Sequence, residues 1–114
     1  MILDWLRSWL SADTDLVVGS RPRSSQWPRV RREHLARYPS CAACGRTREL
    51  EVHHVVPYHE RPDLELEAGN LLTLCADPCH LVHGHLMAWT RINPRVRQDA
   101  DAYLARIREA RAVE

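Results

Sequence analysis

The chain has 114 residues, a formal net charge of +1 and only 6% aromatic residues, with no Phe. This length fits one domain near the lower limit at which a hydrophobic core suffices, so an additional clamp such as a bound metal is expected. No apolar run approaches the ~20 residues of a membrane-spanning helix. From length and composition we therefore expect one small domain without a membrane span.

The first ten residues do not resemble an export signal, because they include Asp4 and Arg7 and lack a small-residue cleavage site. We therefore expect a reducing, cytoplasmic setting, in which four cysteines favour zinc over two disulfides. A disulfide-stapled secreted domain is the alternative, and a thiol titration under denaturing conditions would distinguish the two.

The charge is divided unevenly along the chain. Residues 20–48 contain eight arginines and one acidic residue, whereas residues 49–77 contain seven acidic residues and one arginine. This asymmetry predicts a basic surface for a polyanion and a separate acidic loop.

Residues 1–19 are expected to form an accessory unit, and residues 20–110 the main domain. Apolar side chains at positions 2, 3, 5, 6, 9 and 10 predict a short amphipathic helix that docks on the domain or on a partner. Pro28 should open a second helix, which runs to about Tyr38 and stops at Pro39. Its arginines fit either a solvated face or contact with phosphates, and the candidate DNA contacts are Arg29, Arg31 and Arg32.

A turn at Cys41–Gly45 is predicted next, in which Gly45 relaxes the backbone after the second thiolate. Residues 50–56 are rich in β-branched side chains and end at Pro57, which predicts a strand. An acidic loop then leads to a second short strand at residues 71–75, and the two strands should form an antiparallel hairpin.

Pro78 suits the first turn of a helix that we expect to run from Cys79 to Trp89. Asn93-Pro94 predicts a helix N-cap followed by proline. The final helix would place one apolar face in the core. That face consists of Val96, Ala100, Tyr103, Leu104 and Ile107.

Two kinds of metal ligand alternate between residues 41 and 85. The thiolates of Cys41, Cys44, Cys75 and Cys79 are typical of a structural zinc site. The second pair is separated by three residues instead of two, and Pro78 would bend the chain so that tetrahedral geometry is kept. The imidazoles among them suit a catalytic metal.

A hairpin with His53-His54 on its first strand, Asn70 before its second strand and His80 on the following helix resembles the HNH endonucleases, the ββα-metal or His-Me finger group. The resemblance covers about residues 20–108 and points to small bacterial and phage-type members with a four-cysteine zinc site. It rests on these strings: Trp27-Pro28-Arg29-Val30-Arg31, Cys41-Ala42-Ala43-Cys44-Gly45, His53-His54-Val55-Val56-Pro57-Tyr58-His59, Leu64-Glu65-Leu66, Asn70-Leu71-Leu72-Thr73-Leu74-Cys75, Gly84-His85-Leu86, Trp89 and Asn93-Pro94.

The resemblance implies an α+β fold: a zinc-stabilised ββα-metal core with flanking N- and C-terminal helices. It further implies that His54 is the general base, since a neutral imidazole can take a proton from water at physiological pH. Alternation along a strand sends His53 to the opposite face, where it and His80 would ligate a catalytic divalent ion (Mg²⁺, Mn²⁺, Ni²⁺ or Zn²⁺). Asn70 would tether the hairpin loop and help orient the base.

The last ligand of that ion is either His83 or His85. On a regular helix His83 lies about 60° from His80 and His85 about 140° away, which favours His83. The resemblance favours His85, because Gly-His is matched there. A wide or π-like turn at Gly84 would bring His85 round, and we therefore expect His85.

The sequence predicts a DNA endonuclease that nicks or cleaves both strands. The alternative is a non-catalytic zinc module that binds nucleic acid or a phage packaging protein. The set His53, His54, Asn70 and His80 favours the enzyme, because a binding module does not need it. The role of His59 and the oligomeric state stay open.

Overall fold

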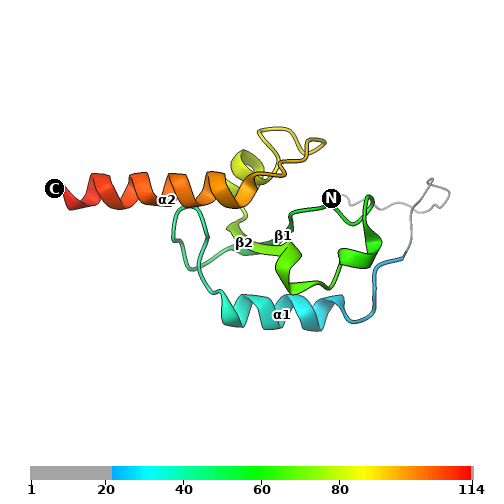
Figure 1. Ribbon diagram of the computed structural model, residues 1–114. Helices are drawn as coiled ribbons and strands as arrows, with labels where there is room; N and C mark the ends of the chain where they lie inside the picture. Colours follow the sequence, from blue (N-terminus) through cyan, green and yellow to red (C-terminus); the bar gives the residue numbers. More distant parts are fainter. Residues whose placement is uncertain (1–21, 114) are drawn as a thin grey trace.

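The computed structural model describes residues 22–113, so the helix expected within residues 1–19 lies outside the described part. A short hairpin of β1 (Leu50–His54) and β2 (Leu71–Cys75) occupies the centre of the molecule (Figure 1). The helices α1 (Trp27–Arg37) and α2 (Val96–Ala112) lie on opposite sides of it (Figure 1). This arrangement is the α+β, ββα-metal architecture that the sequence predicted.

The helix α1 begins one residue before Pro28, which occupies its first turn, and it ends two residues before Pro39. Both boundaries follow the sequence prediction, because proline fits a first helical turn and cannot continue a helix. Val30 and Leu35 are half-buried, and no residue of α1 is fully buried. The helix therefore contacts the hairpin with one side and leaves most of its surface exposed.

The two strands pair antiparallel, with Leu50 opposite Cys75 and His54 opposite Leu71. The first strand was predicted to reach residue 56 but ends at His54. The following backbone groups turn to Asn70: the Val55 amide donates to the Asn70 carbonyl (2.9 Å) and the Val56 amide to Asn70 Oδ1 (2.8 Å).

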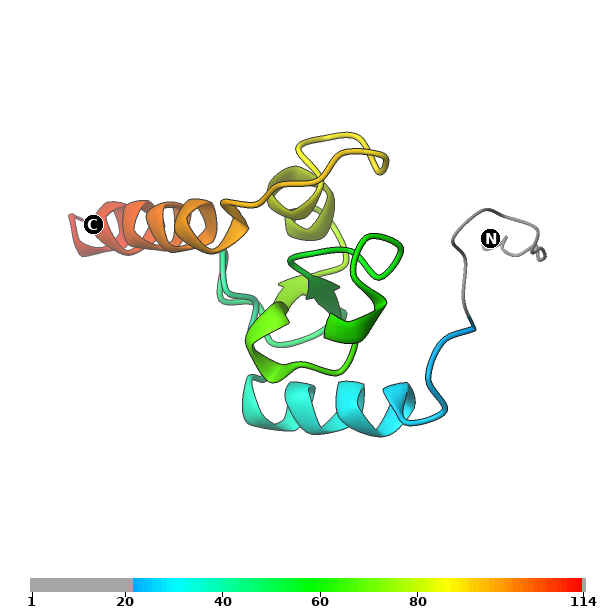
Figure 2. The ribbon, with the colours of Figure 1, turned by 45° about the vertical axis from the view of Figure 1, so that its right-hand side comes forward.

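The core is small and is built around the cysteines. Three of them, Cys41, Cys75 and Cys79, are buried together with Leu74 and Val96. Of the predicted apolar face of α2, only Val96 and Ala100 are buried, while Tyr103, Leu104 and Ile107 are half-exposed. The outer part of α2 extends past the rest of the molecule (Figure 2), which explains why its apolar side chains are not covered.

The helix predicted from Cys79 to Trp89 is wrong. The chain forms only a π-helical turn at His80–Gly84, followed by an irregular loop. Leu86 and Met87 have left-handed backbones (φ 53° and 73°), which no α-helix accommodates. The Met87 amide donates to the Leu81 carbonyl (2.9 Å) and closes the turn. No helix within residues 22–113 is long and apolar enough to cross a membrane.

Candidate active site and zinc site

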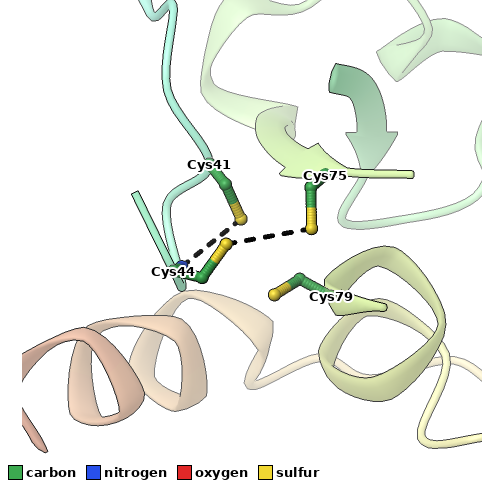
Figure 3. A group of neighbouring side chains, drawn as sticks. All are labelled: Cys41, Cys44, Cys75 and Cys79. Atoms are coloured by element: carbon green, nitrogen blue, oxygen red, sulfur yellow. Dashed lines mark hydrogen bonds between the residues drawn. The ribbon is translucent and has the colours of Figure 1, made fainter. Parts of the chain in front are cut away.

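Four cysteine side chains converge from three segments of the chain. Cys41 and Cys44 precede β1, Cys75 ends β2 and Cys79 precedes the π-turn. Figure 3 shows their sulfur atoms directed toward one another, and all four lie within 4.8 Å of each other without a disulfide. The longer spacing between Cys75 and Cys79 therefore does not prevent the four sulfurs from meeting.

The surroundings of the sulfurs fit a bound cation. The amides of Ala43 and Cys44 both donate to Cys41 Sγ (3.4 Å each). Burial raises the pKa of Cys41, but backbone hydrogen bonds outweigh it and hold that pKa below its usual value. Burial and the neighbouring thiols raise the pKa of Cys79. A bound cation such as zinc would favour the thiolate form of cysteines that are grouped in this way.

The turn at Cys41–Gly45 has the hydrogen bonds of a metal-binding knuckle. The Cys41 amide donates to the Arg46 carbonyl (2.8 Å) and the Gly45 amide to the Cys41 carbonyl (2.9 Å). Gly45 has φ +83°, so the backbone freedom predicted for this glycine is used. Arg46 also donates to the carbonyl of Asp77 (3.0 Å), which joins the two halves of the cysteine group.

Three imidazoles form a second group on the other side of the hairpin. His53 lies on β1, His80 begins the π-turn and His85 follows it. The ring centroids of each pair are 5.0 Å apart, and one nitrogen from each ring lies within 4.8 Å of the others. His83 instead packs against the Tyr103 ring (4.8 Å). The π-turn thus brings His85, and not His83, to the group.

In two of these rings, the nitrogen that faces away from the group makes a hydrogen bond. His80 Nδ1 donates to Glu51 Oε1 (2.6 Å) and His85 Nδ1 to the Arg91 carbonyl (2.9 Å), so both rings present Nε2 inward. A carboxylate or carbonyl behind a ligating imidazole is a common feature of metal sites. Burial, followed by the neighbouring histidines, lowers the pKa of His53 to about 3, so this ring is neutral and can act as a ligand.

Sequence reasoning missed Glu51, although a signal for it was present. Residues two apart on a strand share a face, so Glu51 had to lie on the same side of β1 as His53. A carboxylate at that spacing from a predicted metal ligand marks a candidate partner for a ligating imidazole.

His54 lies on the opposite face of β1 from His53, as the strand alternation predicted. Its Nε2 is 2.9 Å from the Glu65 carbonyl, and its ring lies 4.6 Å from the Trp27 ring. Because a carbonyl only accepts, Nε2 carries the proton and Nδ1 keeps a free lone pair. Burial lowers the pKa of His54, and the bond to Glu65 offsets part of that decrease.

Asn70 is buried and joins the loop after β1 to the start of β2. Its Oδ1 accepts from the Val56 amide, while its Nδ2 donates to the carbonyls of Val56 (3.0 Å) and Leu64 (3.2 Å). These contacts fix the position at which the strand bearing His54 ends, and they are those expected of a tether.

The three converging imidazoles and His54 all line one cavity of about 380 Å³. Arg23 lines it and lies over the Tyr58 ring (4.6 Å), with Nη1 3.4 Å from Glu65 Oε2. Glu65 is buried and also accepts from the Ser24 amide (3.1 Å), so one side chain fixes the segment that carries Arg23. Arg23 therefore places a guanidinium group, paired with Glu65, at the rim of the cavity.

The three arginines of α1 do not form one stripe. Arg29 is paired with Glu33 (3.1 Å), and Arg32 is exposed. Arg31 is half-buried, and its charge contributes to lowering the pKa of Glu51, after the hydrogen bond from His80. Arg31 thus faces the hairpin.

The sequence profile of the HNH endonucleases matches residues 41–85. This segment begins at the first cysteine of the zinc group and ends at the last imidazole of the second group. Residues 41–85 form an HNH domain. No curated protein and no solved structure matches the chain significantly. The HNH domain has the two antiparallel strands and the four-cysteine group of a ββα-metal fold and indicates a role on nucleic acid.

Proposed function

We propose that this HNH domain is a metal-dependent DNA endonuclease in which His54 is the general base. The observation that carries the proposal is one cavity lined both by three converging imidazoles and by His54, which has a different hydrogen-bond partner. On one side, His53, His80 and His85 turn nitrogens toward a common point. On the other, His54 is held by a carbonyl with Nδ1 free. A module that only binds nucleic acid needs neither.

Each of these residues would have a separate role in hydrolysis of the phosphodiester bond. A divalent cation held by His53, His80 and His85 would supply charge stabilisation for the scissile phosphate and the leaving oxygen. His54 takes the proton of the attacking water at Nδ1, while the Glu65 carbonyl keeps the required tautomer. Arg23 offsets phosphate charge at the rim.

The test is cleavage of supercoiled plasmid with added Mg²⁺, Mn²⁺, Ni²⁺ or Zn²⁺. We expect His54→Ala to lose at least about 10²-fold in rate, the usual effect of removing a general base. Its zinc content and melting temperature should match those of the parent. His34→Ala is the control, because His34 does not line the cavity. Full activity of His54→Ala, or no cleavage by folded parent with any metal, would leave the non-catalytic binding module.

The proposed phosphate contacts on α1 are Arg29, Arg31 and Arg32, which would act as separate contacts because they do not share one stripe of the helix. Arginines that neutralise phosphates release counterions, so affinity should fall steeply with salt. In a His54→Ala background, replacing all three by alanine should flatten the salt slope by up to about 2–3 units on every DNA sequence. Identical slopes would show that α1 presents only a solvated face. A phage packaging partner has no support among the contacts and the comparisons.

A further inference from the structure

The loop at residues 86–92 follows the π-turn and exposes several large apolar side chains. Met87 is 66% exposed, Trp89 58%, Leu86 38% and Ile92 36%. A polar rim around a nuclease cavity needs none of them, and exposed apolar side chains grouped in one segment usually mark a contact surface.

The loop is held rigidly in this shape. The Arg91 side chain donates to the Leu86 carbonyl (3.1 Å), and its amide donates to the Ala88 carbonyl (2.8 Å). The Met87 amide is bonded to Leu81. These bonds maintain left-handed backbones at two consecutive non-glycine residues, a costly conformation that persists only where the surroundings impose it. The backbone from which the exposed side chains project is therefore held by defined hydrogen bonds.

Trp89 joins this loop to the candidate active site. Its ring lies 5.2 Å from the His80 ring and 5.0 Å from the His85 ring. It also lines the cavity that contains His53 and His54. Successive nucleotides of a strand are about 3.4 Å apart along a duplex, so a phosphate in this cavity places a neighbouring base within reach of the indole.

We propose that the Trp89 ring is a base-stacking platform that selects DNA with an unpaired nucleotide beside the cleaved phosphate. This inference rests on the proposed nuclease function and names its substrate class. An aromatic ring stacks on any base whose face is free, while a base inside a duplex is already stacked on both faces. Continuity with the cavity favours DNA over a protein as the occupant of this surface.

The experiment measures binding, so that it does not depend on cleavage. Full-length His54→Ala protein is titrated with three labelled DNAs of one sequence: single-stranded, fully paired, and paired with one 2-aminopurine bulge. This His54→Ala protein should bind the bulged DNA more tightly than the paired one and quench the 2-aminopurine, and the further substitutions are made in it. Trp89→Ala should weaken binding to bulged and single-stranded DNA by about tenfold or more, but to paired DNA by less than twofold.

Two further variants separate stacking from support of the histidines. Trp89→Phe should restore most of the affinity, because a phenyl ring also stacks, and Val113→Ala is the control for an exposed apolar residue at the end of α2. Equal losses on all three DNAs would overturn the proposal and make Trp89 a support for His80 and His85. Unchanged binding to all three would also overturn it and leave the loop as a protein-docking surface. Failure of the nuclease function is seen separately, as the absence of plasmid cleavage by the parent.

Discussion

Three of the four imidazoles of the candidate active site are held by a hydrogen bond from one ring nitrogen to a neighbouring oxygen. A carboxylate holds His80 and backbone carbonyls hold His54 and His85, so three rings have defined tautomers before any ligand binds. The close approach of these rings depends on Gly84. A Cβ at that position would lie 3.1 Å from atoms of both His53 and His80.

Gly84→Ala should therefore weaken divalent-metal binding at the histidine group while sparing the zinc and the fold. The added methyl must push buried His53 or His80 outward, and we expect a loss of affinity of about 10- to 100-fold, comparable to removal of a neighbour that orients a ligand. Calorimetric titration of the zinc-loaded protein measures the loss. Gly69→Ala is the matched control, since a Cβ there meets nothing within 4 Å. Equal affinities for the two variants would contradict the prediction.

His34 on α1 should make the domain less stable in acid. Burial, followed by the charge of Arg97, lowers its pKa, and its Nε2 is buried without a hydrogen-bond partner among residues 22–113. The unfolded chain therefore binds a proton at His34 more readily than the folded one. Stability should decrease as the pH falls below about 6.5, the ordinary pKa of histidine. His34→Gln removes this contribution, so its melting temperature should drop less than that of the parent between pH 7.5 and 5.5. Equal decreases in melting temperature for the two proteins would show that His34 makes no such contribution.

At the residue scale, the sequence predicted what periodicity and chemistry determine. The opposite faces of His53 and His54 follow from strand alternation, and the meeting of the four cysteines follows from their spacing. The Glu51, Arg23 and Glu65 contacts were missed. The last two depend on a loop folding back over β1, which no local pattern encodes.

At the element scale, the π-turn determines which histidine joins His53 and His80. A regular helix would have brought His83 round, whereas the wider turn moves His83 onto Tyr103 and His85 into the cavity. Asn93 stabilises this turn, because its Nδ2 donates both to the His83 carbonyl (2.7 Å) and to Asp99 Oδ2 (2.8 Å) on α2.

Replacing the histidines of the π-turn and of the residue after it should reduce activity by unequal amounts. His80→Ala and His85→Ala should both abolish activation of plasmid cleavage by added metal, because each removes a converging nitrogen. His83→Ala should lower the rate only mildly and act on stability through lost packing with Tyr103. Rates and melting temperatures of the three variants are compared. A larger loss of metal activation for His83→Ala than for His85→Ala would reject this arrangement.

The elements themselves were predicted unequally. Prolines mark both ends of α1. The β-branched residues marked β1 less well, since Val52 lies in the strand but Val55 and Val56 lie beyond its end at His54. The helix from Cys79 to Trp89 failed because helical periodicity cannot reveal left-handed backbones at Leu86 and Met87. Those conformations are stabilised by the hydrogen bond from Arg91 to the Leu86 carbonyl and by the one from the Met87 amide to the Leu81 carbonyl, which become visible only in three dimensions.

At the scale of the whole molecule, three of the four predicted zinc ligands belong to the buried core. The other buried apolar residues within residues 22–113 are few: Ala43, Leu71, Leu74, Val96 and Ala100. The principal extents of 54 × 27 × 23 Å include the projecting end of α2. The sequence predicted one zinc-stabilised domain. It did not predict the elongated shape, because an apolar stripe on a helix does not show how far its neighbours extend.

Removal of zinc should unfold the domain. A structural zinc contributes about 10–16 kcal/mol in zinc-finger peptides, comparable to or larger than the total stability of a typical domain. We expect Cys44→Ser, or chelation of the parent, to abolish the cooperative melting transition in circular dichroism, and re-added Zn²⁺ to restore it only in the parent. Elemental analysis should find one zinc per folded chain. Cleanly folded protein without zinc would show that the cysteines are ordinary core residues.

The neighbouring positions of Cys79 and His80 have a thermodynamic consequence. Cys79 of the cysteine group and His80 of the histidine group are consecutive residues, so a shift of one group should also move the other. The two metals should therefore bind with positive cooperativity, and by reciprocity the catalytic ion must tighten the hold on zinc by the same factor that zinc tightens the hold on it.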